Sequence, residues 1–320
     1  MLDIVVVILN YNGYADTIEC IKSVRASTYK CRLIVIDNAS PRNDAELLSA
    51  YLNDDEMLLR ASANLGYAGG CNLGLDFAFR NGADAVFVLN NDTWVDANCL
   101  AQLISALNLK NDIGIVGPKI LFYDDPLTVA FAGITVDPKR VKYERLGYLD
   151  SDSGQFESLI PTSYQEGCAL LITRNCYNTI GGFDVELWSY WEENDLCFRA
   201  RSKGFEVMCQ QSAKVWHKVS ASFGDYYNRS PAAVYFQVRN WVLFHRRYAG
   251  NRIETTGAIL RILSRVPRQA LGILIKGKRN RIKNFRIYIL AMFVGLFSNK
   301  WQPSDMFSPI KVCRDEAMKE

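Results

Sequence analysis

The sequence predicts an α/β fold built on a mostly parallel sheet. Short β-branched runs alternate with longer amphipathic stretches through the first third of the 320 residues, the pattern of strands joined by crossover helices. Hydrophobic residues make up 49% of the chain and charged residues 22%, which suits a packed core. This composition excludes a disordered or collagen-like chain, and the length fits one large domain or two.

The elements of the first third follow one another in a regular order. Short apolar runs predict strands at residues 4–9, 33–37, 57–60, 85–89 and 114–117. Amphipathic periodicity predicts helices at residues 14–26, 44–52, 70–80 and 98–107. These segments form a nucleotide-binding type of α/β domain.

The middle of the chain, residues 119–165, is rich in Asp, Pro, Gly and Tyr and lacks a long periodic run. We expect loops and short antiparallel strands there, of the kind that shape a substrate pocket. A second regular stretch follows, with a strand at residues 168–173 and a helix at 193–203. Gly204 is suited to end that helix.

The net charge of +3 hides a strong segregation of charge along the chain. Residues 1–245 carry 21 basic and 29 acidic side chains, whereas residues 246–300 carry 13 and 1. We therefore predict a catalytic domain at 1–245 and a basic, amphipathic, helical region at 246–320. The longest uncharged run of that region, 287–299, has 13 residues, whereas a membrane-spanning helix needs about 20.

The basic region is predicted to dock on an anionic membrane surface, with its helices lying in the interface. Nucleic acid is the other anionic partner that a basic region can take. Apolar residues interleave with the basic ones, however, and no known nucleic-acid module is present, so we expect no nucleic-acid partner.

Nine cysteines, an odd number without a CxxC pair, predict buried free thiols in a reducing compartment. The chain begins directly with a strand-like run and shows no signal peptide pattern. We therefore expect a cytoplasmic protein that associates peripherally with the inner face of the cell membrane.

Polar clusters lie just beyond several predicted strands, where open α/β sheets bind ligands. Asp37 is suited to accept a hydrogen bond from a base or a ribose, although an Asx turn that caps the next helix is the more common role of such a tetrapeptide. A glycine-rich segment opens the following helix, and its backbone can approach a phosphate or simply make a tight turn. The candidate donor-binding residues are Asn10, Tyr11, Asn12, Asp37, Asn38, Ser40, Asn64, Gly66, Gly69, Gly70, Asn90 and Asn91.

Two residues form a candidate metal site. Asp92 follows a buried strand, where a carboxylate can hold Mg²⁺ or Mn²⁺ against a diphosphate. His217 ends an apolar strand and can supply a nitrogen ligand to the same cation. A turn cap for Asp92 and a structural role for His217 are the alternatives, and His245 is expected to be structural.

Carboxylates and aromatic residues gather at the start of the helix near residue 193. Glu192 and Glu193 are the candidate catalytic residues, although ordinary helix capping accounts for acids at a helix start. Aromatic faces beside carboxylates are typical of a sugar-binding cleft. The candidate acceptor-binding residues are Asp184, Trp188, Tyr190, Trp191 and Asp195.

Taken together and in order, these clusters resemble the family 2 glycosyltransferases, especially the bacterial rhamnosyltransferase-like branch. The matching stretches span about residues 4–222 and are ILNYNG, VIDNAS, NLGYAGGCNLG, VLNNDT, GGFDVELWSYWEENDLCFRAR and VWHKVSAS. The resemblance implies a GT-A fold and a UDP- or dTDP-linked sugar donor, with rhamnose as a candidate sugar. It also implies inversion at the anomeric carbon and a lipid-linked or cell-surface polysaccharide acceptor.

The resemblance also implies roles for individual residues. Asp37 would contact the base or ribose, and Asp92 would be the surviving acid of the metal-binding DxD motif, whose first position is Asn90 here. Glu193 would be the catalytic base, with Glu192 as the alternative. His217 would lie close to the metal and the diphosphate.

Two other functional classes remain open on the sequence alone. A nucleotidyltransferase would share the nucleotide and metal sites but would release pyrophosphate. A degenerate, non-catalytic sugar-binding protein would keep the fold without the chemistry. A Rossmann dehydrogenase is disfavoured because the first strand leads into Asn-Tyr-Asn-Gly rather than a glycine fingerprint.

Overall fold

The computed structural model describes residues 2–218, 229–278 and 280–297. Residues 298–320 of the predicted C-terminal region, and residues 219–222 at the end of the VWHKVSAS stretch, lie outside these ranges. The first half of the chain forms β1 (Ile4–Asn10), α1 (Tyr14–Arg25), β2 (Arg32–Asp37), α2 (Asp44–Tyr51), β3 (Met57–Arg60), α3 (Gly66–Arg80), β4 (Ala85–Asn90), β5 (Thr93–Val95), α4 (Cys99–Leu109) and β6 (Ile113–Phe122). The second half forms β7 (Val129–Phe131), β8 (Ile134–Asp137), β9 (Lys142–Arg145), β10 (Leu159–Pro161), β11 (Ala169–Thr173), α5 (Arg174–Ile180), α6 (Glu192–Ser202), β12 (Glu206–His217), α7 (Pro231–Tyr248), α8 (Arg252–Lys276) and α9 (Arg281–Phe297).

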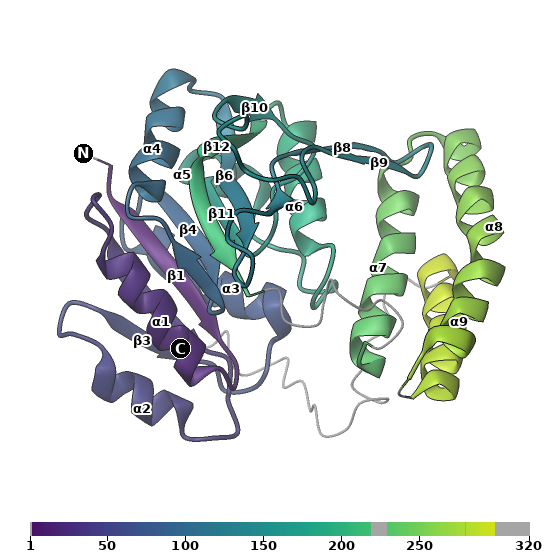
Figure 1. Ribbon diagram of the computed structural model, residues 1–320, viewed down its shortest axis with the longest axis horizontal. Helices are drawn as coiled ribbons and strands as arrows, with labels where there is room; N and C mark the ends of the chain where they lie inside the picture. The colour runs from purple at the N-terminus through teal and green to yellow at the C-terminus, as the bar shows by residue number, and fades with distance from the viewer. Residues whose placement is uncertain (1, 219–228, 279, 298–320) are drawn as a thin grey trace.

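The central sheet follows the strand order β10-β12-β6-β11-β4-β1-β2-β3, with β5 paired to β12 and β7 to β6 (Figure 1). β4, β1, β2 and β3 run parallel, and β11 is antiparallel to both of its neighbours. Every residue of β1 is buried, because helices cover both faces of the parallel part and only a continuous apolar run tolerates that environment. The predicted mixed, mostly parallel α/β architecture is confirmed.

The predicted elements of the first third are all present, with shifted ends. α3 begins at Gly66 rather than residue 70, because Gly66 enters the helix with a φ of +70° that a side chain would disfavour. β6 continues to Phe122, beyond the predicted 114–117, since its outer half pairs with β7 and β12. The irregular middle contains the short strands β7 to β10, as expected.

Helices α7, α8 and α9 pack on one another in a separate layer, which lies beyond β8 and β9 as seen from the central sheet (Figure 1). Ser230 caps α7 with its hydroxyl, and Asn251 and Glu254 form a capping box at the start of α8. The three helices bury a second apolar core. The predicted domain boundary between residues 245 and 246 lies inside α7.

Two further properties concern all the residues that the structure describes. Within residues 2–218, 229–278 and 280–297, no helix combines the length and apolarity needed to cross a bilayer. The eight cysteines in these ranges are free thiols, and all but Cys31 are buried.

Candidate active site

The carboxyl ends of β1 and β2 are tied together by a buried amide. Asn10 Nδ2 lies 2.9 Å from Asp37 Oδ1, 3.2 Å from Ser40 Oγ and 3.3 Å from Asp44 Oδ2. Asp37 is only 3% exposed and also accepts from Ser40 Oγ at 2.6 Å and from the Ser40 amide at 3.2 Å. The Asx-type turn is therefore present, and Asn10 and Asp37 organise this loop from within.

The surface of the same loop is formed by residues that Asn10 and Asp37 hold in place. Tyr11 is 47% exposed, and the Asn12 amide donates to Ser40 Oγ at 2.9 Å. Asn12 has a φ of 56°, a left-handed conformation that asparagine tolerates better than most residues. These side chains and backbone groups are the ones available to a nucleotide at this edge of the sheet.

Asn38 joins the β2 loop to the glycine-rich segment. Its Oδ1 accepts from the Leu65 amide at 2.9 Å, and its Nδ2 donates to the Gly66 carbonyl at 3.0 Å and to Asn64 Oδ1 at 3.2 Å. A Cβ on Gly66 would lie 2.6 Å from the Trp188 ring, so only glycine lets the segment pack against that tryptophan. Gly70 similarly packs against Asn38 and Leu9.

Asp92 and His217 lie side by side at the carboxyl ends of β4 and β12. His217 Nε2 is 3.0 Å from Asp92 Oδ1, because β12 runs antiparallel to β5 and pairs His217 with Thr93. Burial opposes charge on both groups, yet their mutual contact lowers the pKa of Asp92 and raises that of His217 well above its usual range. Burial also raises the pKa of the adjacent Cys168, which keeps it a neutral thiol, so the Asp92 carboxylate is the charge that matters to His217.

The donor set at Asp92 fits a divalent cation that is completed by substrate. No group of three or more His, Cys, Asp or Glu side chains in metal-binding geometry occurs among the described residues, so the protein offers no closed cage. Mg²⁺ and Mn²⁺ are commonly bound by one or two protein ligands, with phosphate oxygens and water filling the octahedron. The neighbouring Asn90 Oδ1 is buried and has no partner in the described part of the chain, which leaves one further oxygen beside the pair.

Asn91 faces away from this site. Its Nδ2 donates to Thr17 Oγ1 at 3.0 Å and to the Gly13 carbonyl at 3.2 Å, which anchors the β4 turn on α1. Asn91 therefore supports the position of the residues that follow it.

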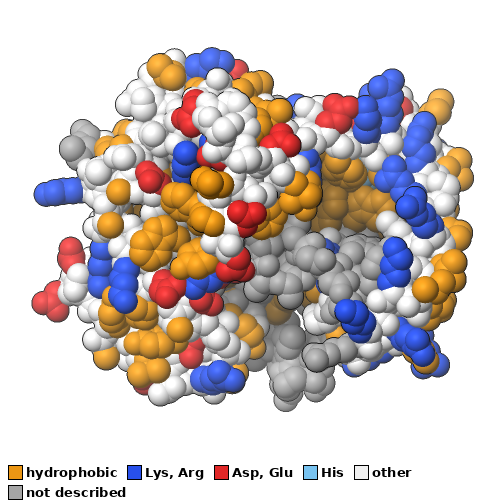
Figure 2. All heavy atoms as spheres, viewed as in Figure 1, with side chains coloured by type: hydrophobic (Ala, Val, Ile, Leu, Met, Phe, Trp, Pro, Cys, Tyr) orange, Lys and Arg blue, Asp and Glu red, His pale blue; other side chains and the backbone are white. Residues whose placement is uncertain are grey.

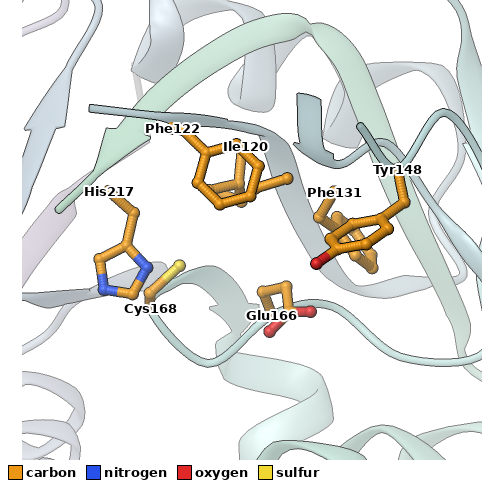
Figure 3. Close-up of a pocket in the computed structure, with 8 residues that line it drawn as sticks. Ile120, Phe122, Phe131, Tyr148, Glu166, Cys168 and His217 are labelled. Carbon is orange, nitrogen blue, oxygen red and sulfur yellow. The ribbon is translucent and has the colours of Figure 1, made fainter. Parts of the chain in front are cut away.

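A narrow cleft connects His217 to a carboxyl group that sequence reasoning missed. Figure 3 shows His217 and Cys168 on one side of the cleft, with Glu166 below and Phe122 above. Burial raises the pKa of Glu166, while the charges of Arg145 and His217 oppose that rise. Glu166 and Tyr148 line both this cleft and the larger cavity beyond it.

Glu193, in the first turn of α6, lines the larger cavity, whose volume is about 560 Å³. Burial raises the pKa of Glu193 well above its usual range, and the nearby Glu192 and Glu166 raise it further. Glu192 is 5% exposed and does not line this cavity, and burial raises its pKa to about 8. Of the two candidate bases, Glu193 is the one that faces the space where an acceptor can bind.

The loop before α6 is held in an unusual conformation. Trp188, Tyr190 and Trp191 have φ values of 63°, 67° and 74°, a region that bulky side chains rarely adopt. Asn240 Nδ2, in α7, lies 2.8 to 3.0 Å from three carbonyl oxygens of this loop, those of Leu187, Ser189 and Tyr190. α7 thus fixes the strained backbone that leads into the first turn of α6.

The predicted acceptor-binding residues separate into two groups. Tyr190 and Trp191 line the cavity with Glu193. Trp188 instead stacks on Phe236 of α7, with ring centroids 6.1 Å apart. Asp184 and Asp195 lie at a different depression, where Arg247 pairs with Asp184 at 2.7 Å and with Asp195 at 2.9 Å.

A comparison with known protein families decides the affiliation of the chain. Residues 5–177 match the model of the family described as "Glycosyl transferase family 2". The chain belongs to glycosyl transferase family 2. The matched residues cover the loops after β1 and β2, the glycine-rich segment and Asp92, whereas Glu193 and His217 lie beyond them.

Relatives of this family 2 chain include characterised and uncharacterised proteins. The low-salt glycan biosynthesis hexosyltransferase Agl10 of Haloferax volcanii is 24% identical over 214 residues, which cover 65% of each chain. An uncharacterized protein of Mycobacterium tuberculosis, Rv1525, is 30% identical over 161 residues, 48% of this chain and 54% of that one. The chain thus spans about half to two thirds of the length of these relatives. The dTDP-rhamnosyl transferase RfbF of Shigella flexneri is 20% identical over 300 residues, 92% of this chain and 95% of that one.

Solved structures confirm the GT-A fold of this family 2 chain. GalNAc-T7, solved with UDP, GalNAc and Mn²⁺, superposes with a TM-score of 0.62 at 16% identity, over 92% of this chain and 56% of that one. The mannosyltransferase PcManGT of Pyrobaculum calidifontis, solved with GDP-Man and Mn²⁺, gives a TM-score of 0.55 at 14% identity over 94% and 90% of the two chains. At these identities the likeness concerns the fold alone.

Sequence reasoning missed several residues that line the two cavities. Tyr143, Arg145 and Glu166 lie in or next to the irregular middle, and Trp241 lies on α7. Glu166 stands three residues before β11 begins at Ala169, close to a strand end where a search for carboxylates would have found it. No local signal in the sequence relates Trp241 to Glu193.

Proposed function

We propose that this chain transfers a hexose from a nucleotide-diphosphate sugar to an acceptor hydroxyl, with inversion at the anomeric carbon. The observation that carries the proposal is the position of Glu193, which faces a cavity of about 560 Å³ connected through Glu166 to the Asp92 and His217 pair. A carboxylate with a raised pKa is well matched to accept a proton near neutral pH.

The reaction at this site is a direct displacement. Glu193 accepts the proton of the acceptor hydroxyl while its oxygen forms a bond to the anomeric carbon, and the bond from that carbon to the diphosphate breaks. The cavity holds the two substrates in line, and such positioning supplies much of the rate of a bimolecular step. The aromatic residues Tyr190 and Trp191 offer faces on which the acceptor sugar can pack.

The donor nucleotide is assigned to the edge of the sheet formed by the β1 and β2 loops. Tyr11 and Asn12 are exposed there, while Asn10, Asp37 and Asn38 hold these loops and the largely buried glycine-rich segment in shape. Asp92 would hold Mg²⁺ or Mn²⁺, and His217 would join it as a ligand once it has lost the proton it shares with Asp92. A bound divalent cation supplies charge neutralisation for the departing diphosphate. UDP and dTDP are the expected nucleotides, and rhamnose is a candidate sugar because RfbF is described as a dTDP-rhamnosyl transferase.

A lipid-linked or cell-surface saccharide acceptor is supported by the surface of α8 and α9. Large exposed apolar side chains follow one stripe on each helix, at helical spacing: Ile253, Leu260, Leu263, Leu271 and Ile275 on α8, and Ile282, Ile289, Phe293 and Phe297 on α9. Figure 2 shows Lys and Arg side chains interspersed with apolar ones over the side of the molecule where α8 lies. Such a surface suits an anionic bilayer, and free thiols suit the inner face of the cell membrane.

A screen of nucleotide sugars tests this function. The protein is incubated with UDP- and dTDP-linked hexoses, including dTDP-rhamnose, with and without Mn²⁺, and release of UDP or dTDP is measured. Release of nucleoside diphosphate with one donor is expected, and release of pyrophosphate would instead indicate a nucleotidyltransferase. Absence of both products with every donor, together with retained nucleotide binding, would favour a non-catalytic sugar-binding protein.

Membrane docking is tested separately by flotation with vesicles. Binding to vesicles that contain about 30% anionic lipid is expected to weaken when Phe293 and Phe297 are both replaced by Ser, and to vanish for neutral vesicles. Leu109 and Leu127, exposed apolar residues of the catalytic domain, provide the matched control. Equal flotation of all variants would contradict docking through α9.

A further inference from the structure

Three arginines from separate segments line the cavity in front of Glu193. Arg145 comes from the end of β9, Arg229 precedes α7, and Arg265 comes from the middle of α8. Segments far apart in the chain therefore converge on one space. The irregular middle contributes Arg145 to the cavity, and α8 contributes Arg265. A catalytic domain that ended before α8 would lack the second of these arginines.

Arginines predominate among the charged side chains of this cavity. Its only lining carboxyl groups among the described residues are Glu166 and Glu193, and burial raises the pKa of both. Three guanidinium groups, which stay charged at every pH near neutrality, therefore stand against two carboxyl groups. Basic groups thus outnumber acidic ones among the described residues that line the cavity.

Arg265 is among the residues that line the cavity and can contact a ligand there. Its Nη2 donates to the Val141 carbonyl at 3.0 Å, which anchors the side chain without neutralising it. Among the described residues, no carboxylate lies within 4.0 Å of its nitrogens. Arg145 lies over the Tyr148 ring at 4.8 Å, a contact that orients its guanidinium.

The remaining walls suit a saccharide. Tyr190, Trp191 and Trp241 present aromatic surface, and Gln237 and Gln269 add amide groups. These walls are fixed, because Trp241 Nε1 donates to Tyr143 Oη at 3.1 Å and Tyr288 Oη donates to Gln269 Oε1 at 2.7 Å. The cavity thus combines aromatic and amide surface, which suits a saccharide, with arginine side chains.

We propose that the acceptor is an anionic saccharide whose phosphate or carboxylate group is bound by Arg145 and Arg265. This inference rests on the proposed function, since it assigns the cavity to the acceptor. The donor diphosphate belongs to the Asp92 and His217 side, across the cleft that contains Glu166. Arginine is suited to this role because its planar fork binds phosphate and carboxylate oxygens in pairs.

The test measures binding by the fluorescence of Trp191 and Trp241, which line the cavity. The full chain is titrated with glucose 1-phosphate, methyl glucuronide and the neutral methyl glucoside. At least one of the two charged sugars should bind about tenfold more tightly than methyl glucoside, because one charge-assisted hydrogen bond changes the dissociation constant by about that factor. Preference for glucose 1-phosphate assigns a phosphate, and preference for the glucuronide assigns a carboxylate.

Variants of α8 distinguish the effect of losing the Arg265 charge from the effect of disturbing the fold. Arg265→Gln is expected to lose the tenfold preference, and Arg265→Lys is expected to retain most of it. Arg261→Gln is the matched control, because Arg261 lies one turn earlier and also donates to a backbone carbonyl, that of Lys139, but does not line the cavity. Equal binding of charged and neutral sugars, or an unchanged preference in Arg265→Gln, would overturn the inference.

A nucleotide control distinguishes this inference from the proposed function. Binding of UDP and dTDP is expected to be unchanged in Arg265→Gln, and an equal loss of nucleotide binding would assign the arginines to the donor and overturn the inference. If the anionic sugars bind as expected while no nucleotide sugar is turned over, the anion-binding cavity stands and the proposed transferase function fails.

Discussion

The side-chain amide of Asn240, in the middle of α7, lies 2.8 Å from the backbone carbonyl oxygen of Tyr190. Tyr190 and the adjacent Trp191 both have left-handed backbone conformations, and Trp191 directly precedes α6. A helix of the C-terminal layer thus holds the backbone on which the candidate catalytic residues depend. Asn240 acts as a positioning residue for Glu193.

Replacement of Asn240 by Ala should lower kcat at least tenfold and leave the dissociation constant of the donor nucleotide unchanged. The loss of bonds to three buried carbonyl groups should also lower the free energy of unfolding by about 1–3 kcal/mol. Steady-state kinetics and denaturant titration measure the two effects. Asn81→Ala, which removes an amide contact to the Phe77 carbonyl at the exposed end of α3, is the control and should leave kcat unaltered.

Replacement of Glu193 by Gln should reduce transfer about a thousandfold, because general base catalysis is lost while the shape of the side chain is kept. Donor binding, measured by calorimetry, should not change. Glu192→Gln is the matched control and should keep most of the activity, since Glu192 does not line the cavity. Comparable losses in the two variants would contradict the assignment of Glu193 as the sole base.

Removal of divalent cations with EDTA should weaken nucleotide binding about tenfold, and Mn²⁺ should restore it. Asp92→Asn should bind the nucleotide weakly whether or not Mn²⁺ is present, because its amide is a poor ligand for a hard cation. Calorimetry with UDP and dTDP measures both effects. Asp96→Asn is the control. The Asp96 carboxylate accepts a hydrogen bond from the backbone amide of Asn98, two residues on, and this variant should respond to Mn²⁺ like the unmodified chain.

The contribution of Glu192 to stability should fall as the pH rises from about 5 to about 8. Burial raises the pKa of Glu192 to about 8 in the folded chain, whereas an unfolded Glu titrates near a pH of about 4.3. Between these values the folded state binds more protons than the unfolded state, so raising the pH favours unfolding. Glu193 contributes in the same direction.

Glu192→Gln should reduce this pH dependence, since its amide stays neutral at every pH. The variant should melt several degrees above the unmodified chain at about pH 9 and at nearly the same temperature at about pH 5. Thermal melts across that range provide the measurement. A variant that is less stable at the alkaline end would show that the Glu192 carboxylate is stabilised by its surroundings.

The part of the fold that sequence reasoning predicted is the part with strong local periodicity. The short apolar runs of β1 and β4 fit few structures other than buried strands. Because the two strands are parallel, the polar residues that follow them meet at one edge of the sheet. Asp92 and His217, 125 positions apart, were predicted to share a cation because both follow apolar strands, and they lie in contact. Their use by a metal stays a prediction.

The part that sequence reasoning could not predict depends on long-range packing. Asn10 was assigned to the donor but holds three side chains of the β2 loop. Asp195, a candidate acceptor-binding residue, pairs with Arg199 one turn on, as helical spacing allows, but also with Arg247 of α7, which is 52 residues away. Both side chains are polar residues at the expected strand or helix ends, and only the arrangement of the loops and of α7 determines which way such groups face.

α7 is shared by the two hydrophobic cores of the molecule. Phe244 packs in the core of the sheet, whereas Val242, two residues earlier, packs with α8 and α9. Unfolding either core would expose one face of this helix and so weaken the other core. We therefore expect the catalytic fold and the helical layer to unfold together, and truncation of the chain within α7 to remove stability from the site as well as the surface that carries Arg265.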